Sequence, residues 1–199
     1  MTKTKLKRPE VLAPAGTLEK LKVAITYGAD AVYIGGNAYG LRSRAGNFSY
    51  EEMAEGVAFA KEHDAKVYVA ANMVTHEFDA KGAGEFFREL RDVGISAVIV
   101  SDPALIEICI TEAPGLPVHL STQSSATNFE TLEFWKNEGL ERVVLGREVS
   151  MDEVKTIREI AVNNVEVTKK KKKPVTVTVV VEKVVTATTE SKKAEPKST

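Results

Sequence analysis

Two arginines among glycines form the strongest chemical signal in this sequence. Residues 35–49 read Gly-Gly-Asn-Ala-Tyr-Gly-Leu-Arg-Ser-Arg-Ala-Gly-Asn-Phe-Ser, with Arg42 and Arg44 near the middle. A guanidinium offers a planar fork of donors that suits a carboxylate or a phosphate, and glycine lets the backbone approach a ligand closely. We therefore expect an anion-binding loop here. A surface loop with solvated arginines is the alternative.

Polar side chains also follow other apolar runs of the sequence. Asn72, Gln123 and Arg147 each end such a run where no turn or helix cap requires a polar group, and Glu148 follows Arg147. Most of these groups form hydrogen bonds, so the pattern favours binding of a small polar or anionic molecule over acid–base hydrolysis. The expected ligand-binding residues are Gly35, Gly36, Arg42, Arg44, Asn72, Gln123, Arg147 and Glu148.

No spacing typical of nucleophilic catalysis or of a metal site occurs in the sequence. The histidines His63, His76 and His119 are far apart, and there is no P-loop. The one cysteine, Cys109, lies in an apolar stretch, so we expect a buried thiol rather than a nucleophile. No catalytic residue and no metal ligand is assigned from the sequence.

Composition limits the compartment and the partners. Residues 161–199 hold nine lysines against four glutamates while the whole chain has a net charge of -1, so the first 160 residues are mildly acidic. This balance argues against broad coating of nucleic acid. One cysteine excludes an intramolecular disulfide, and neither a signal-peptide start nor an apolar run of about 20 residues is present. We expect a cytoplasmic protein that does not enter a membrane.

Strand-like and helix-like segments alternate up to residue 160. Six apolar runs predict strands, and residues at helical spacing between them predict helices with N-terminal capping residues. The runs are residues 10–13, 31–34, 66–72, 97–100, 117–120 and 142–145, and the caps are Thr17, Ser49 with Glu52, Asp102, Thr127 with Glu130, and Ser150 with Glu153. Continuous apolar strands that alternate with helices predict an α/β fold with a parallel sheet.

Two parallel architectures fit this alternation, an incomplete TIM-like barrel and a doubly wound open sheet. The first glycine occurs in Ala15-Gly16-Thr17 and not in G-x-G-x-x-G, which favours the barrel. Residues 1–168 are expected to form the partial barrel, with Val165-Glu166-Val167 as the possible start of a seventh strand. Residues 169–199, rich in Lys, Val and Thr, are expected to be a disordered tail or to pair along a sheet edge.

Three motifs in the first fifty residues resemble the amino-terminal part of the collagenase-like peptidase family U32. They are Pro-Glu-Val-Leu-Ala-Pro-Ala-Gly at residues 9–16, Gly-Ala-Asp-Ala-Val-Tyr-Ile-Gly-Gly at residues 28–36 and Leu-Arg-Ser-Arg-Ala-Gly-Asn-Phe at residues 41–48. Further matches at residues 69–72, 101–103, 121–123 and 147–150 extend the resemblance over about residues 9–160.

The resemblance implies a (βα) barrel and one of several activities. The family name implies a metal-dependent peptidase acting on peptide. Better-understood relatives take part in hydroxylating tRNA uridine or ribosomal RNA cytidine, with a prephenate-derived requirement and an iron–sulfur cluster, and others help hydroxylate the ubiquinone ring. An RNA or a peptide substrate is therefore expected from the resemblance.

The sequence departs from the family pattern after residue 160. Family members continue into spaced cysteines that bind the cluster, whereas this chain has Thr168 and five lysines. A cluster needs several thiolates, so we expect none on this chain. The expectation is a truncated U32-type protein that keeps an anion-binding part. The alternative is a non-catalytic binding module, or a fragment that needs a protein partner to complete the barrel. His63-Asp64 also replaces the family's His-Gly at a helix end.

Overall fold

The computed structural model describes residues 9–36, 39–40, 48–73, 75–76, 78, 80–167 and 176–178, with side chains up to residue 160. Strands and helices alternate along the chain, as the sequence predicts. The strands are β1 (Leu12–Pro14), β2 (Ala31–Gly35), β3 (Lys66–Ala71), β4 (Ala97–Val100), β5 (Val118–Leu120), β6 (Arg142–Val144) and β7 (Thr176–Thr178). The helices are α1 (Leu18–Thr26), α2 (Tyr50–Glu62), α3 (Ala83–Val93), α4 (Pro103–Glu112), α5 (Phe129–Asn137) and α6 (Met151–Val167), with a 3-10 turn, η1 (Thr122–Ser124).

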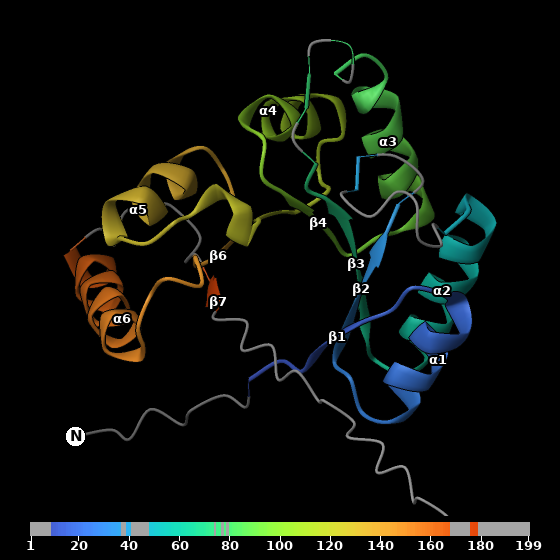
Figure 1. Ribbon diagram of the computed structural model, residues 1–199, viewed down its shortest axis with the longest axis horizontal. Helices are drawn as coiled ribbons and strands as arrows, with labels where there is room; N and C mark the ends of the chain where they lie inside the picture. Colours follow the sequence, from blue (N-terminus) through green and yellow to red (C-terminus); the bar gives the residue numbers. More distant parts are fainter. Residues whose placement is uncertain are drawn as a thin grey trace, which may run out of the picture.

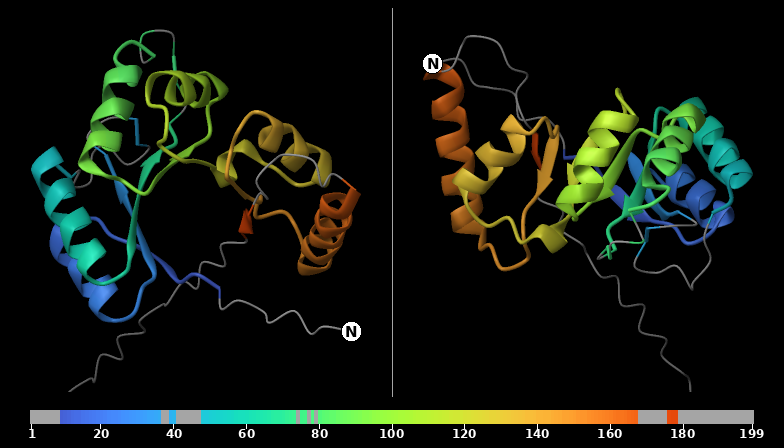
Figure 2. Two further views of the ribbon diagram at one scale, coloured as in Figure 1. Left: turned by 180° about the vertical axis from the view of Figure 1, so that it is seen from behind. Right: turned by 90° about the horizontal axis from the view of Figure 1, so that it is seen from above.

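One parallel sheet contains the seven described strands in the order β1-β2-β3-β4-β5-β6-β7. The strands form a curved sheet, and the helices lie on its outer side (Figures 1 and 2). A doubly wound sheet reverses its strand order and carries helices on both faces. A sequential order with helices on the outer side is instead the arrangement of a (βα) barrel. The predicted incomplete TIM-like barrel is therefore confirmed as a half-barrel.

The main hydrophobic core lies between the outer face of the sheet and the helices. Alternate residues of each strand point to this side, and Val32, Val69 and Val98 are completely buried there. The inner face carries a much smaller apolar cluster, formed by Ala31, Tyr68 and Ala97. Polar side chains lie on the same inner face, so the concave side of the sheet differs in chemistry from the packed side.

Helix caps fix where most of the helices begin. The hydroxyl of Thr17 accepts from the backbone N–H of Lys20, and Ser49 forms a complete capping box with Glu52. The predicted pairing of Ser150 with Glu153 is also present. Each cap satisfies an N–H that has no partner inside its own helix, which stabilises the start of the helix by about 1 kcal/mol.

One predicted cap is wrong by one residue. Asn128, and not Thr127, precedes α5, and its side-chain oxygen accepts from the backbone N–H of Thr131 at 2.9 Å. The Thr127–Glu130 capping box is therefore not formed. Asparagine is at least as good a cap as threonine. Of the two overlapping capping patterns in the sequence, the structure therefore forms the one that starts at Asn128.

Left-handed residues end several helices. Gly28, Gly94 and Gly139 have φ angles of 98°, 89° and 97°, which glycine adopts without steric cost. After α2 the corresponding residue is Asp64, with φ 53°. A side chain therefore occupies a backbone conformation that favours glycine.

The carboxyl-terminal region differs from one sequence expectation. Val165, Glu166 and Val167 continue α6 and do not begin a strand. The seventh strand is Thr176–Thr178, which runs parallel to β6, so these three residues pair along the sheet edge. The rest of residues 169–199 lies outside the described residues, and the division at residue 168 stays an expectation. Among the described helices, none has both the length and the apolar character needed to cross a lipid bilayer.

Candidate functional site

The carboxyl ends of the parallel strands bring polar groups to one edge of the half-barrel. Strand β2 ends at Gly35, and β3 and β4 are followed by Asn72 and by Ser101 with Asp102. Ser121 follows β5. We call this set the carboxyl-end rim: Gly35, Gly36, Asn72, Ser101, Asp102, Ser121, Gln123, Ser124 and Arg147. In (βα) barrels this edge is where active sites form.

Hydrogen bonds tie the segments after β3, β4 and β5 to one another. Ser101 Oγ donates to the backbone oxygen of Asn72 at 3.3 Å, and Ser124 Oγ donates to the backbone oxygen of Ser101 at 2.9 Å. Ser121 Oγ accepts from the backbone N–H of Gln123 at 3.4 Å. Because three successive segments are linked in this way, the rim has a defined shape rather than being a set of separate loops.

Asp102 has two roles in the rim. Its carboxylate caps α4, accepting from the backbone N–H groups of Ala104 at 2.8 Å and Leu105 at 3.3 Å. The hydroxyl of Thr75 also donates to it. Burial raises the pKa of this carboxyl, but the hydrogen bonds from Thr75, Leu105 and Ala104 outweigh burial and lower the pKa from its usual value. Asp102 is therefore an anionic cap that also positions the segment after β3.

The predicted site residues that the structure describes lie after different strands and differ in exposure. Gly35 and Asn72 lie at the ends of neighbouring strands, and Asn72 is half-buried. Gln123, Arg147 and Glu148 are exposed after β5 and β6. Gly36 forms an isolated parallel bridge with Phe48, which fixes the end of the glycine-rich stretch beside β2. Arg42 and Arg44 lie outside the described residues, so the convergence of the arginines on one pocket stays a prediction.

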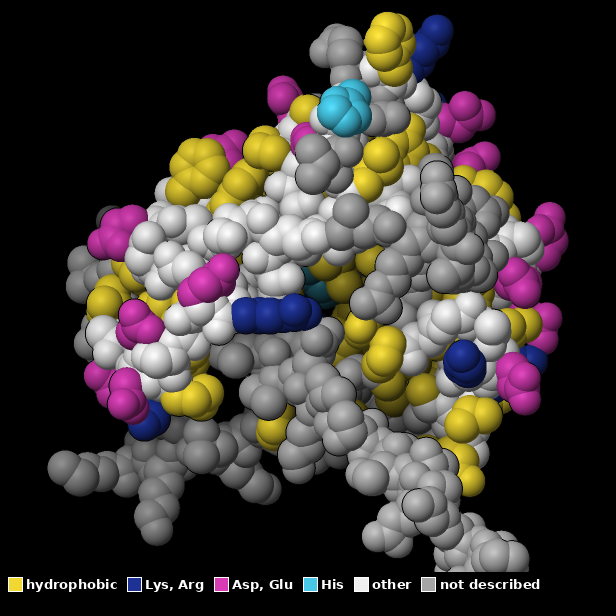
Figure 3. All heavy atoms as spheres, in the orientation of Figure 1, with side chains coloured by type: hydrophobic (Ala, Val, Ile, Leu, Met, Phe, Trp, Pro, Cys, Tyr) yellow, Lys and Arg dark blue, Asp and Glu magenta, His cyan; other side chains and the backbone are white. Residues whose placement is uncertain are grey.

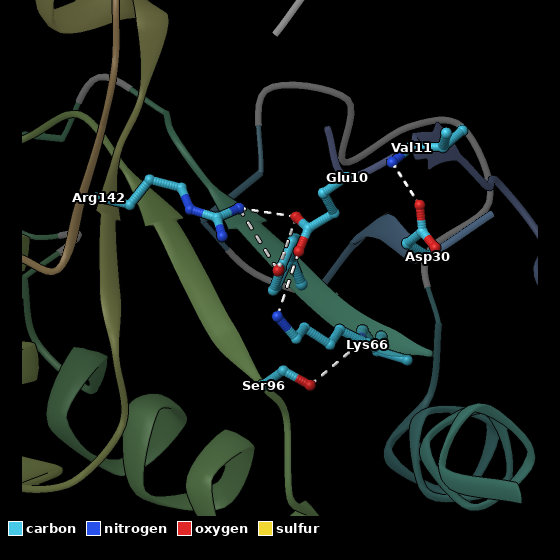
Figure 4. A network of polar contacts seen from close by, with 8 residues as sticks. Glu10, Val11, Asp30, Lys66, Ser96 and Arg142 are labelled. Carbon is cyan, nitrogen blue, oxygen red and sulfur yellow. Dashed lines mark hydrogen bonds and ion pairs between the residues drawn. The ribbon is translucent and has the colours of Figure 1, made fainter. Parts of the chain in front are cut away.

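A second polar group, which sequence reasoning missed, lies on the inner face toward the amino ends of the strands. We call Glu10, Lys66, Tyr68, His119 and Arg142 the inner-face cluster. Arg142 Nη1 donates to Glu10 Oε1 at 2.8 Å, Tyr68 donates to the same oxygen at 3.0 Å, and Lys66 Nζ lies 3.2 Å from Glu10 Oε2 (Figure 4). Both carboxylate oxygens of Glu10 are thus satisfied.

Aromatic contacts complete the inner-face cluster. The guanidinium of Arg142 lies 5.5 Å from the centre of the Tyr68 ring, within range of a cation–π interaction. The Tyr68 and His119 rings meet edge to face with their centres 4.9 Å apart. Burial raises the pKa of Tyr68 to about 12, so its hydroxyl stays protonated and donates to Glu10.

The pKa values of Glu10 and His119 are both lowered within this cluster. Burial raises the pKa of Glu10, but hydrogen bonding and attraction from Arg142, with smaller effects of Tyr68 and Lys66, lower it below its usual value. Burial, followed by the charge of Arg142, lowers the pKa of His119 to about 3. At neutral pH the cluster therefore contains a carboxylate, two cations and a neutral imidazole.

A weak sequence signal for this cluster exists. Lys66 and Tyr68 are two positions apart on β3 and so share its inner face, while Arg142 begins β6. A charged residue at the start of an otherwise apolar strand, as at Lys66 and Arg142, is the feature of the sequence that indicates this cluster. The contacts of Glu10 with side chains of β3 and β6 across the interior could not be derived from spacing.

An iron–sulfur cluster, which the family resemblance implies, does not fit the residues of this chain. Its one cysteine, Cys109, is completely buried in α4, and burial raises the pKa of the thiol to about 12. Cluster ligation needs several accessible thiolates. Among the described residues, no group of three or more His, Cys, Asp or Glu side chains could hold a metal ion.

The fold and the rim together define a partial (βα)-barrel protein with a polar carboxyl edge. The family follows from comparison with known proteins. Residues 16–170 match peptidase family U32, and the chain belongs to this family.

Curated relatives of the chain include RNA-modifying proteins. It is 53% identical over 153 residues to tRNA hydroxylation protein P1 of Bacillus subtilis (strain 168), covering 77% of this chain and 36% of that protein. It is 42% identical over 154 residues to tRNA hydroxylation protein P of Escherichia coli (strain K12), covering 76% of this chain and 33% of that protein. The chain thus spans about a third of the length of these relatives.

The solved structure of the U32 peptidase Mk0906 is similar in fold. It superposes with a TM-score of 0.64 and 16% sequence identity, over 80% of this chain and 68% of that one. This likeness supports the barrel-type arrangement of the strands.

Proposed function

We propose that this chain supplies the amino-terminal half-barrel of a protein that acts in tRNA hydroxylation, and that its carboxyl-end rim binds a small carboxylate or phosphate. The 53% identity to tRNA hydroxylation protein P1 of Bacillus subtilis carries the first part of the proposal. Identity of this size over 153 residues supports a shared role for the half-barrel. It does not extend to the two thirds of that relative that this chain does not match.

The chemistry of the rim supports the second part. Asn72, Gln123 and Arg147 offer amide and guanidinium donors at the edge where barrel proteins bind ligands. Arg42 and Arg44 lie in the glycine-rich stretch of the sequence between Gly36 and Phe48. Several arginines near one site repel one another unless an anion or Glu148 compensates them. A bidentate carboxylate or phosphate would do so through charge-assisted hydrogen bonds.

Binding is tested by calorimetry on the full chain with malonate, succinate and phosphate, against chloride at the same ionic strength. We expect binding that weakens in Arg42→Ala and in Arg147→Lys, because lysine keeps the charge but loses the fork. Arg88→Lys is the matched control, since Arg88 pairs with Glu112 between α3 and α4, away from the rim. If no carboxylate or phosphate binds at millimolar concentration, the rim is not an anion site.

The role in hydroxylation is tested by a graft. Residues 9–160 of this chain replace the matching segment of Bacillus subtilis tRNA hydroxylation protein P1 in cells that lack the native gene, and hydroxylated tRNA nucleosides are measured by mass spectrometry. We expect the graft to restore hydroxylation and the graft with Arg147→Ala to lower it. A graft with Lys20→Ala, an exposed change on α1, is the control. A stable graft without hydroxylated tRNA would refute a shared role.

A non-catalytic, partner-dependent role is the second candidate, and the single buried Cys109 favours it. With one inaccessible thiol, any iron–sulfur chemistry must come from another polypeptide segment. On this view the chain alone binds the anion but hydroxylates nothing. Cleavage of gelatin by the purified chain, lost on chelation, would instead support a peptidase.

A further inference from the structure

The inner face of the half-barrel is hollowed and contains an unusual histidine. Figure 3 shows a hollow over the sheet with a lysine or arginine side chain (dark blue) along one edge and a histidine side chain (cyan) at its floor. His119 on β5 is 6% exposed. Among the described residues no group makes a hydrogen bond to its imidazole, and none of their buried side-chain nitrogens or oxygens lacks a partner. The imidazole nitrogens are therefore not fully buried and are accessible to solvent.

Arg142 has donors left over beside this histidine. His119 and Arg142 are register partners on neighbouring strands β5 and β6. The contacts of Arg142 to Glu10 and Tyr68 both use Nη1. Figure 4 shows the other nitrogens of the guanidinium outside the dashed contacts. Since no buried polar side-chain atom of the described residues is unsatisfied, Nε and Nη2 are open to solvent as well.

The groups that remain open in the hollow are mostly donors. Both oxygens of Glu10 are occupied by Arg142, Tyr68 and Lys66, and the Tyr68 hydroxyl already donates to Glu10. What remains is the guanidinium edge of Arg142, further N–H groups of Lys66, and the N–H and acceptor nitrogen of the neutral imidazole. One carboxylate against two cations leaves an excess of one positive charge. A ligand that fits must therefore accept hydrogen bonds and carry about one negative charge.

We propose that the inner face holds a second ligand site, distinct from the carboxyl-end rim, in which Arg142 and His119 together bind the carboxylate of a small monoanion. The planar carboxylate accepts from the free edge of the Arg142 guanidinium and from the N–H of His119. Glu10 keeps Arg142 in place from the other side, and Tyr68 holds the His119 ring edge to face. Neither residue is among those that the proposed function uses, so this site stands independently of that function.

The wild-type chain gives the first test. The full chain is labelled with ¹⁵N-histidine, and its three histidine side-chain signals are assigned with His63→Gln, His76→Gln and His119→Gln. Sodium benzoate and sodium acetate are titrated at constant ionic strength, with benzamide as the uncharged match of benzoate. We expect benzoate or acetate to shift the His119 signals alone, and benzamide to shift none. No His119 shift with either carboxylate at 50 mM, roughly the top of the useful weak-binding range, would overturn the proposal.

Variants give the second test, by calorimetry with benzoate. His119→Phe keeps a ring against Tyr68 but removes the donor, and we expect affinity to fall about tenfold. The matched control His63→Phe changes an exposed histidine stacked on Phe59 and should leave affinity unchanged. Circular dichroism and melting curves check that each variant folds.

A third variant separates this site from the rim. Arg147→Ala should leave benzoate binding and the His119 shift unchanged, because Arg147 belongs to the rim. Loss of binding in Arg147→Ala together with normal binding in His119→Phe would place the anion at the rim and overturn the inner-face site. The opposite result would support the inner-face site even if the rim binds nothing.

Discussion

Arg142 and Glu10 are 132 residues apart in the sequence, yet Arg142 Nη1 lies 2.8 Å from Glu10 Oε1. Glu10 precedes the first strand and Arg142 begins the sixth, so this ion pair crosses the interior of the half-barrel. The side chains are 20% and 14% exposed. The contact thus joins the two sides of an open sheet through partly buried charges, where solvent screens little.

Removal of one partner should destabilise the half-barrel. In Glu10→Gln the Arg142 guanidinium loses its counter-charge in a partly buried place, and we expect the free energy of unfolding to fall by about 1.5–3 kcal/mol. Urea denaturation at neutral pH measures the change. Arg88→Gln is the control, because its pair with Glu112 is 43% and 53% exposed. That change should cost less than about 1 kcal/mol, and equal effects of the two variants would contradict a special role for the crossing pair.

The buried histidine predicts how stability depends on pH. The pKa of His119 is lowered from 6.5 to about 3 by burial and by Arg142, so the folded chain keeps it neutral while the unfolded chain protonates it. The unfolded state therefore binds more protons below pH 6.5, and stability falls as pH decreases from 6.5 toward 3. The contribution is at most about 1.4 kcal/mol per pH unit.

The measurement compares the free energy of unfolding at pH 7 and at pH 5. The pKa of Glu10 is lowered from 4.5, so its stabilising contribution is present above that value and is lost only at more acidic pH. The interval from pH 7 to 5 therefore isolates the histidine. His119→Gln should make this loss of stability smaller, whereas His63→Gln should not. An unchanged pH dependence in His119→Gln would show that the imidazole is solvated.

The sequence predicted the parts of the fold that depend on local patterns. Apolar runs located β2, β3, β4 and β5 within about two residues, and the Thr17 and Ser49 caps were read correctly. These features depend on neighbours in the chain, so spacing reveals them. The alternation of strands and helices predicted a parallel sheet, but it fitted a doubly wound sheet as well as a barrel, so it did not determine the strand order.

The inner-face cluster could not be predicted in the same way. Glu10, Lys66 and Arg142 come from three segments distant in sequence, and each has an ordinary local explanation as the polar end of a strand. Only the curvature of the sheet brings them together across the interior. Val165 similarly has high strand propensity but continues α6, because intrinsic propensity is weak against an established helix. The role of Arg42 and Arg44 in binding an anion stays a prediction.

The helix end at Asp64 offers a stabilising substitution. Asp64 has φ 53°, and the backbone N–H of Ala65 closes the end of α2 by donating to the Ala60 oxygen at 2.9 Å. A side chain in this conformation meets steric cost that glycine avoids. Asp64→Gly should raise the free energy of unfolding by roughly 1 kcal/mol, measured by urea denaturation. Asp64→Ala removes the carboxylate without relieving the backbone and should not stabilise. Stabilisation by both would indicate a charge effect instead.

The start of α5 distinguishes two overlapping capping patterns. Asn128 Oδ1 accepts from the Thr131 N–H at 2.9 Å, and its extended backbone, φ -141° and ψ 166°, is that of a capping residue. Asn128→Ala leaves this N–H without a side-chain partner and should lower the free energy of unfolding by about 1 kcal/mol.

Thr127→Ala changes an exposed side chain outside the cap, and its free energy of unfolding should stay within about 0.5 kcal/mol of the wild type. Asn128→Ser keeps an oxygen acceptor and should recover most of the stability, which separates capping from loss of packing. Thermal melts of the three variants at one pH give the comparison. A larger loss in Thr127→Ala than in Asn128→Ala would place the helix start at Thr127 and restore the capping box with Glu130.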